Sequence, residues 1–238
     1  MRPTLWRTCA IVGVLGYALL VVALSALNGL LTRPPVAYGQ SLAAVFDRPT
    51  TSSPIALSAD NSLLWVVNPD DDSATVIRTD TNVAIKRIAV GDEPQSIALD
   101  PNNTFAYVAN AASNNVTVIK ITNASPASFV AAPDLTVGVG GTITTGAEPW
   151  NIVSSPDGLR IFVANSGQDT LTVINALNRS VIGSVNLRDS VCNGSTPAQR
   201  ARHFQPRGLA VSANSGQFYV TRFLSFVRPD GVQGSDTG

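Results

Sequence analysis

"FAYVANAASNNVTVI", residues 105–119, returns almost unchanged as "IFVANSGQDTLTVI" at residues 161–174. Extending the comparison on either side of these stretches gives four segments that superpose: 54–68, 96–110, 151–165 and 208–222. Their matching apolar positions, Ile55, Ile97, Ile152 and Leu209, are separated by 42, 55 and 57 residues. Internal repeats with a period near 42 residues are typical of propellers and solenoids.

Each repeat contains short runs that favour β-strands. In the second repeat these are "SIAL" at 96–99, "FAYVAN" at 105–110 and "TVI" at 117–119, separated by turn-forming Asn, Asp and Gly. A fourth run follows at 83–91, at 142–146 and at 180–187 in the first three repeats. "FAYVA" is apolar on both faces, as expected for a strand between two neighbouring sheets. The sequence therefore predicts an all-β fold, a β-propeller of four-stranded antiparallel blades, with the longer repeats carrying insertions outside the matched strands.

Two recurrent motifs give this pattern a family resemblance. They are the strand ends "YVAN" at 107–110, "FVAN" at 162–165 and "YVTR" at 219–222, and the linkers "GDEP" at 91–94 and "GAEP" at 146–149. In both, the chain resembles the YVTN family of β-propeller repeats. The resemblance implies a propeller, commonly seven-bladed, in a secreted, periplasmic or surface protein. It implies no single activity, because this scaffold carries lactonase-like enzymes, dehydrogenase subunits and binding modules.

The number of repeats is smaller than the resemblance implies. Seven units of this size need about 290 residues, whereas residues 50–238 hold about three and a half blades. We therefore expect an N-terminal part of a longer propeller. A monodisperse soluble monomer of residues 40–238 in light scattering would contradict that expectation.

The first forty residues differ in composition from the repeats. Arg2 and Arg7 precede an uncharged run from Cys9 to Leu31, and "AYG" at 37–39 fits a signal-peptidase site. The apolar run is also long enough to span a bilayer. We expect residues 1–39 to be a signal peptide or a retained anchor (residues 9–31), followed by a linker at 40–49, with the propeller at 50–238 outside the cytoplasm. Beyond this leader only Cys192 remains, which excludes an internal disulfide and a C-x-x-C-H haem attachment.

Candidate binding residues come from the loops that share one face of a propeller. Strand direction reverses at each step, so the linker into a blade and the loop after its second strand open on the same side. Arg222 replaces the recurrent Asn of the strand end, and with Arg207 and His203 it forms a candidate carboxylate or phosphate site. Glu93 and Glu148 occupy corresponding linkers and form a candidate acid/base or metal-binding pair. For the recurrent Asn68, Asn110 and Asn165 we expect a structural role, with each side chain bonding its own backbone at a turn.

The net charge and the absence of known catalytic motifs limit the classes of function that the sequence supports. The formal net charge is zero, which gives no reason to expect nucleic acid, and membrane contact is expected only through the N-terminal segment. The sequence contains no G-x-S-x-G, P-loop or H-E-x-x-H motif, so no catalytic residue, metal or cofactor is assigned. The leading hypothesis is a binding or interaction scaffold for a protein or small molecule on the loop face. The alternatives are a lactonase-like propeller enzyme and a subunit of a periplasmic redox or dehydrogenase system.

Overall fold

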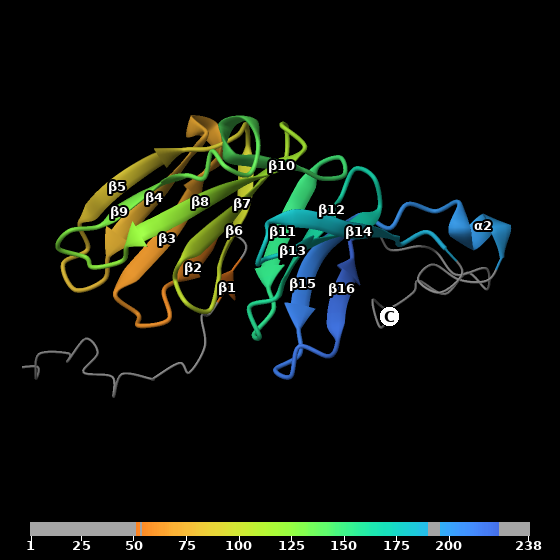
Figure 1. Cartoon of the computed structure of the whole chain (residues 1–238). Helices are drawn as coiled ribbons and strands as arrows, with labels where there is room; N and C mark the ends of the chain where they lie inside the picture. Colours follow the sequence, from red (N-terminus) through yellow and green to blue (C-terminus); the bar gives the residue numbers. More distant parts are fainter. Residues whose placement is uncertain (1–50, 53, 190–195, 224–238) are drawn as a thin grey trace, which may run out of the picture. The chain divides into compact units, whose positions relative to one another are not determined.

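The fold is a series of antiparallel sheets that follow one another along the chain (Figure 1). The computed structural model describes residues 51–52, 54–189 and 196–223, which all belong to a compact unit spanning Phe46–Gly238. The expected leader, the linker at 40–49 and Cys192 lie outside the described residues. Within the described ranges, no helix is long and apolar enough to cross a bilayer.

Four sheets correspond to the four sequence repeats, and we call them blades 1 to 4. Blade 1 comprises β2 (Ile55–Leu57), β3 (Leu63–Asn68), β4 (Ser73–Arg78) and β5 (Ala84–Ala89), with β1 (Thr51–Ser52) added beside β2. Blade 2 comprises β6 (Pro94–Leu99), β7 (Phe105–Asn110), β8 (Asn115–Asn123), β9 (Val130–Pro133) and β10 (Thr142–Thr144). Blade 3 comprises β11 (Pro149–Ser154), β12 (Arg160–Asn165), β13 (Thr170–Asn175) and β14 (Ser180–Asn186). Blade 4 comprises β15 (Pro206–Val211) and β16 (Phe218–Arg222). The predicted four-stranded antiparallel blades are confirmed, and the fourth is described as far as its second strand.

The outer strand of blade 2 differs from the prediction. It is made of two pieces, because β10 pairs with the first half of β8 and β9 pairs with the second half. The insertion between them, which includes the 3₁₀ turn η2 (Val139–Gly141), therefore lies within the sheet's outer edge. The predicted fourth strand at 142–146 corresponds to β10, and β9 is an additional strand that the insertion itself forms. Other short helical elements are η1 (Pro69–Asp71) and α2 (Pro197–Arg200).

The hydrophobic core is divided among the blade interfaces. One cluster, which includes Trp65 and Val108, lies between blades 1 and 2, and a second, which includes Tyr107 and Ile161, lies between blades 2 and 3. A smaller one, around Phe162, joins blade 3 to blade 4. Because Tyr107 and Val108 are neighbours on β7, that strand is buried on both faces, as the "FAYVA" pattern predicted. Burial of apolar surface between successive blades thus stabilises the stack.

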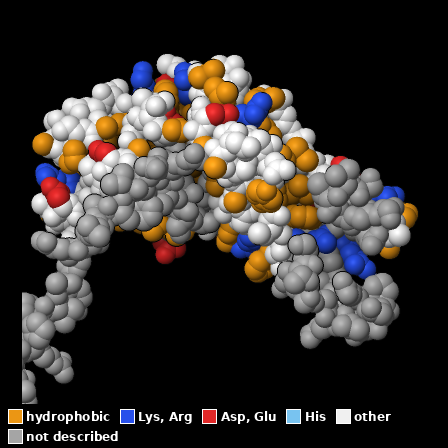
Figure 2. All heavy atoms as spheres, turned by 90° about the horizontal axis from the view of Figure 1, so that it is seen from below, with side chains coloured by type: hydrophobic (Ala, Val, Ile, Leu, Met, Phe, Trp, Pro, Cys, Tyr) orange, Lys and Arg blue, Asp and Glu red, His pale blue; other side chains and the backbone are white. Residues whose placement is uncertain are grey.

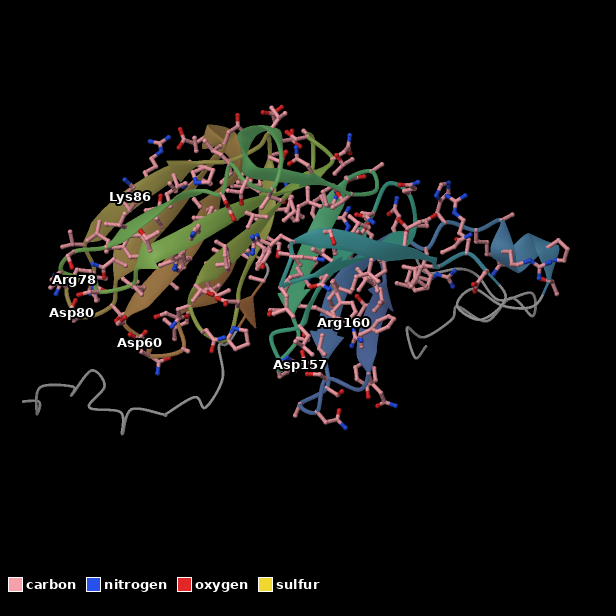
Figure 3. All side chains as sticks on the ribbon, viewed as in Figure 1. Asp60, Arg78, Asp80, Lys86, Asp157 and Arg160 are labelled. Carbon is pink, nitrogen blue, oxygen red and sulfur yellow. The ribbon has the colours of Figure 1, made fainter. Side chains whose placement is uncertain are left out.

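The turns between the first and second strands of the blades share one backbone conformation. Asn61, Asn103, Gly158 and Ser215 stand at the same position of the four turns, and all have positive φ. Gly and Asn tolerate this conformation in tight hairpins, and Ser215 adopts it in the fourth turn. Asp60 and Asp157, labelled in Figure 3, lie in the turns of blades 1 and 3 at this hairpin-turn end of the blades.

The recurrent Asn at the end of each second strand has a structural role, but not through its own backbone. Nδ2 of Asn110 donates to Oγ1 of Thr117 (2.9 Å) and to Oδ1 of Asn115 (2.7 Å) on the next strand. Nδ2 of Asn165 donates to Thr172 and Thr170 in the same way, as does that of Asn68 to Thr75 and Ser73. The expected bond to its own backbone was wrong, because the side chain crosses to the third strand instead.

This Asn also explains the glycine of the linkers. A Cβ added to Gly91 would lie 2.8 Å from Nδ2 of Asn110, and one added to Gly146 would lie 2.7 Å from Nδ2 of Asn165. The backbone of the linker therefore packs directly on the Asn side chain. Gly and Asn form one unit in each of these two blades.

We expect Gly91→Ala to lower the free energy of unfolding by about 1–3 kcal/mol, because overpacking a close contact strains both partners. Combining it with Asn110→Ala should cost at least about 0.5 kcal/mol less than the sum of the single changes, since the contact is then gone. Urea unfolding of the four proteins measures this coupling. Gly183→Ala is the matched control, because a Cβ there would meet nothing within 4 Å. Full additivity of Gly91→Ala and Asn110→Ala would contradict the contact.

Candidate functional site

The linkers and the loops after the second strands lie together at one end of the blades, which we call the linker face. A repeated hydrogen bond joins them. The backbone N–H of Glu93 donates to Oδ1 of Asp72 (3.0 Å), and that of Glu148 donates to Oδ1 of Asn114 (2.8 Å). In each bond, the linker that leads into a blade donates to a side chain of the preceding blade. We call this contact the inter-blade clasp.

Glu93 and Glu148 are held in an unusual conformation by the clasp. Their φ angles are +50° and +53° although each precedes a proline, a combination that is rare outside glycine. Gln205, the corresponding residue of the third linker, has φ +47°. The two glutamates thus occupy equivalent positions of successive linkers. Their recurrence follows from the repeat, and the structure gives no contact between their carboxylates.

The third clasp, between blades 3 and 4, has additional charged partners. Oδ1 of Asp169 accepts from the backbone N–H of Gln205 (2.7 Å), while Oδ2 accepts from Nε of Arg188. Nδ1 of His203 lies 3.0 Å from the same Oδ2 and 2.6 Å from Nη2 of Arg188. The Asp169 side chain is fully buried, whereas those of Arg188 and His203 are 35% and 58% exposed. A buried carboxylate therefore lies within hydrogen-bond distance of two basic side chains at the protein surface.

Burial on its own would raise the pKa of the Asp169 carboxyl. The N–H of Gln205, the hydrogen bond from Arg188 and the charge of Arg188 act against this and bring the pKa below its ordinary value. Asp169 is therefore charged at neutral pH.

His203 and Arg222 replace the two members of the Gly–Asn unit at this junction. Counting back from the linker proline, His203 stands where the other linkers have Gly91 and Gly146. Arg222 stands where the other blades have the bridging Asn. The Arg222 guanidinium lies over the ring of Phe204, 4.9 Å from its centroid. A structural contact found at two junctions is thus exchanged for two basic side chains at the third.

Arg222 lies in a partly desolvated and basic environment. Burial, and next the charge of Arg202, lower the pKa of its guanidinium, while the charge of Asp169 acts in the opposite direction. A guanidinium in such surroundings remains protonated in proteins, but the positive charge is incompletely solvated.

Arg207 is presented by a β-bulge. The first strands of blades 2, 3 and 4 each carry a register shift just after the linker proline, at Gln95, at Trp150 and at Arg207–Gly208. Bulges re-aim side chains and are frequent near functional sites. The Arg207 guanidinium contacts two rings, with its Cζ 3.5 Å from the Trp150 centroid and 4.5 Å from the Phe223 centroid. Its Nε is buried and has no hydrogen-bond partner among the described residues.

The structure brings three of the five predicted site residues to the junction of blades 3 and 4. His203, Arg207 and Arg222 all lie there, on the linker into β15 or on β15 and β16. Glu93 and Glu148 lie at the two preceding junctions. Figure 2 shows Arg side chains, in blue, at the end of the described part that carries blade 4 and α2.

Two residues of this cluster, Asp169 and Arg188, were not singled out from the sequence. Asp169 stands four residues after Asn165, as Asp72 stands after Asn68, so the repeat alignment contained a signal for the clasp. Arg188 begins an insertion that has no counterpart in the other repeats, and in the sequence it stands out only as one of the arginines concentrated in the last fifty residues.

A separate cavity lies at the hairpin-turn end. Its volume is about 670 Å³, and Pro101, Val153, Asp157, Val211 and Ser215 are among the residues that line it. None of the five predicted site residues lines it. Among the described residues, no group of three or more His, Cys, Asp or Glu side chains is placed to hold a metal ion.

Comparison with sequence families matches residues 19–127 to "Lactonase, 7-bladed beta-propeller". The match covers less than half of the chain and ends before blade 3. No curated protein matches the sequence significantly.

Three solved structures resemble the chain over most of its length. They are hydrazine synthase of Kuenenia stuttgartiensis (25% identity, TM-score 0.56, 77% of this chain and 45% of that one); a functionally unknown protein of Desulfotomaculum acetoxidans (20%, 0.55, 71% and 48%); and the β-propeller domain of Cps50 (Swd1) of Myceliophteria thermophila (10%, 0.53, 74% and 49%). The chain thus spans about half the length of the structures it matches. With the lactonase-family match and the observed blades, these similarities identify the chain as a β-propeller protein.

Proposed function

We propose that the protein is an extracytoplasmic binding module that takes an anionic ligand, carboxylate or phosphate, on its linker face at the junction of blades 3 and 4. The observation that carries the proposal is the joint exchange of the Gly–Asn unit for His203 and Arg222. Two other junctions keep a packed contact that stabilises the fold. The junction of blades 3 and 4 lacks this packed contact and has two basic side chains at the same positions. The extracytoplasmic location rests on the composition of the first forty residues alone.

The surroundings of the basic side chains suit an anion. Two rings lie against the guanidinium of Arg207, and its N–H groups would bind the anion. Arg222 is partly desolvated beside Arg202, so an anion there would offset unfavourable like charge. Hydrogen bonds between charged partners contribute about 1.5–3 kcal/mol each. Two such contacts would be enough for a weak but specific small-molecule site.

Isothermal titration with oxalate and with sulfate tests the site, because one probe presents carboxylates and the other a tetrahedral oxyanion like phosphate. We expect Arg207→Gln or Arg222→Gln to weaken binding at least about tenfold, the loss of one charge-assisted hydrogen bond. Lys86→Gln is the matched control, since Lys86 lies on β5 in blade 1, away from blade 4 (Figure 3). Equal binding by all four proteins, or no binding of either probe, would refute the proposed site.

A second candidate is a propeller enzyme, which the lactonase-family match over residues 19–127 favours. In that case Glu93 and Glu148, which occupy equivalent linkers, would supply the carboxylates, and Arg222 would orient the substrate. The similarity to hydrazine synthase favours instead a subunit of an enzyme complex. Hydrolysis of a panel of lactones, with Glu93→Ala, Glu148→Ala and Arg222→Ala alongside, decides the first case. Absence of turnover, or rates unchanged by all three substitutions, would exclude these residues as catalytic.

A further inference from the structure

Asp169, Arg188 and His203 form a three-membered contact in which one atom has two incompatible partners. Nδ1 of His203 lies within hydrogen-bond distance of both Nη2 of Arg188 (2.6 Å) and Oδ2 of Asp169 (3.0 Å). An imidazole nitrogen either offers a lone pair or carries a hydrogen. Without a proton, Nδ1 accepts from Arg188. With a proton, it donates to Asp169 and can accept nothing from Arg188.

We propose that Arg188 is a further ligand-binding residue of the anion site and that protonation of His203 releases it to the ligand. This inference rests on the proposed anion-binding function. In the neutral tautomer that carries its hydrogen on Nε2, Nδ1 of His203 accepts from Nη2 of Arg188. When His203 gains a proton, Nδ1–H donates to Asp169, and the imidazolium repels the guanidinium beside it. The N–H groups at the end of Arg188 are then free to bind an anion.

Arg188 is positioned for this exchange. Its Nε donates to the buried carboxylate of Asp169, and that bond does not depend on the state of His203. The guanidinium is therefore held in place at one end while its other end changes partner. The side chain is 35% exposed, so its free end can reach solvent or a bound ligand.

The other charged groups of this part of the chain set the sign of the effect. Asp169 from the β12–β13 loop and Arg188 after β14 contact the imidazole. The charge of Arg222 at the end of β16 interacts with those of Asp169 and Arg202. Asp189 follows Arg188, and Arg200 ends α2, in the same segment between β14 and β15. Basic groups outnumber acidic ones, so a proton on His203 adds to an excess of positive charge. A bound anion opposes that excess and favours the proton, because linkage between two sites is reciprocal. Anion binding should therefore be stronger at the lower pH, where more of the protein carries the proton on His203.

The experiment measures oxalate and sulfate affinity of the full chain by isothermal titration at pH 5.5 and at pH 8.0. Both probes keep their charge over this range, so a change in affinity reports on the protein. We expect binding about tenfold tighter at pH 5.5, within the usual range of coupling between two sites. His203→Gln keeps an acceptor for Arg188 but cannot titrate. This variant should bind equally at both pH values.

Arg188→Lys separates release of Arg188 from the charge of the imidazolium alone. The lysine keeps a positive charge beside Asp169, so the fold is retained, but it lacks the fork of N–H groups. We expect this variant to lose most of the gain at pH 5.5. Should it keep the full pH dependence, the imidazolium alone would account for the effect, and the role of Arg188 would be overturned.

The outcomes for the two proposals can be told apart. Binding that is the same at both pH values but lost in Arg207→Gln would overturn the coupling and leave the anion site intact. No binding of either probe at any pH would overturn the anion site and this inference with it. A preference for oxalate over sulfate would identify a planar carboxylate as the ligand chemistry, and the reverse preference would identify a phosphate-like group.

Discussion

Replacing Trp65 by Ala should lower the free energy of unfolding by about 3–5 kcal/mol, the usual cost of truncating a fully buried aromatic side chain. Trp65 on β3 has no exposed surface and lies in the cluster between blades 1 and 2. Its ring meets Phe129 edge-on, with centroids 5.7 Å apart. The substitution removes this contact and leaves a cavity at the blade interface. Urea unfolding followed by circular dichroism measures the change, and Trp65→Phe provides a milder variant that should retain the fold.

Leu64→Ala is the matched control, because Leu64 is the neighbouring residue on the opposite face of the same strand and is half-buried. It should cost only about 1 kcal/mol, in proportion to the smaller area removed from water. If Leu64→Ala cost as much as Trp65→Ala, the outer face of blade 1 would also be packed against apolar surface in solution. That outcome would contradict the division of the core among the described interfaces.

The fold could be predicted because the same pattern of strands and turns recurs four times in the sequence. The matching positions Ile55, Ile97, Ile152 and Leu209 predict the first strand of each blade. Because "FAYVA" is apolar on both faces, it predicts a neighbouring sheet on each side of the strand, as the two core clusters show. By contrast, β9 lies in an insertion that the other repeats lack, so comparison of the repeats could not predict this strand. Its pairing is decided by the free edge of β8, which is a property of the folded sheet.

The site was predictable only in part, for a similar reason. Arg222 was identified because it departs from a repeated Asn, and the structure shows that His203 departs at the position that contacts this Asn in the other blades. The sequence does not reveal that these two positions are in contact, because the linker glycine and the strand-end Asn are 19 residues apart in blade 2. Asp169 has an equivalent in every described clasp, but its pairing with Arg188 depends on an insertion that the other blades lack.

Asp169→Ala should be among the most destabilising single changes outside the core, at about 2–4 kcal/mol. The substitution removes a buried acceptor from the N–H of Gln205 and from two basic side chains. Its cost is expected to be below the upper limit for buried ion pairs, because Arg188 and His203 are partly exposed and can be solvated by water. Asp169→Asn separates the two contributions, since Asn114 already makes the clasp in blade 2. The asparagine should retain the bond from Gln205 and lose only the charged contacts.

The acid dependence of stability gives the sharper test of the Asp169 carboxylate. Its pKa in the folded protein lies below the ordinary value of about 3.9 for an unfolded chain. A group with a depressed folded-state pKa contributes stability that is fully present above the unfolded value and is lost as pH falls through the folded one. Urea unfolding at pH 7 should therefore show the wild type more stable than Asp169→Asn, and the difference should shrink steadily below about pH 4. A difference that stays constant down to pH 2 would mean that the charge of Asp169 does not stabilise the junction, and that Asp169 contributes there only through the clasp from Gln205.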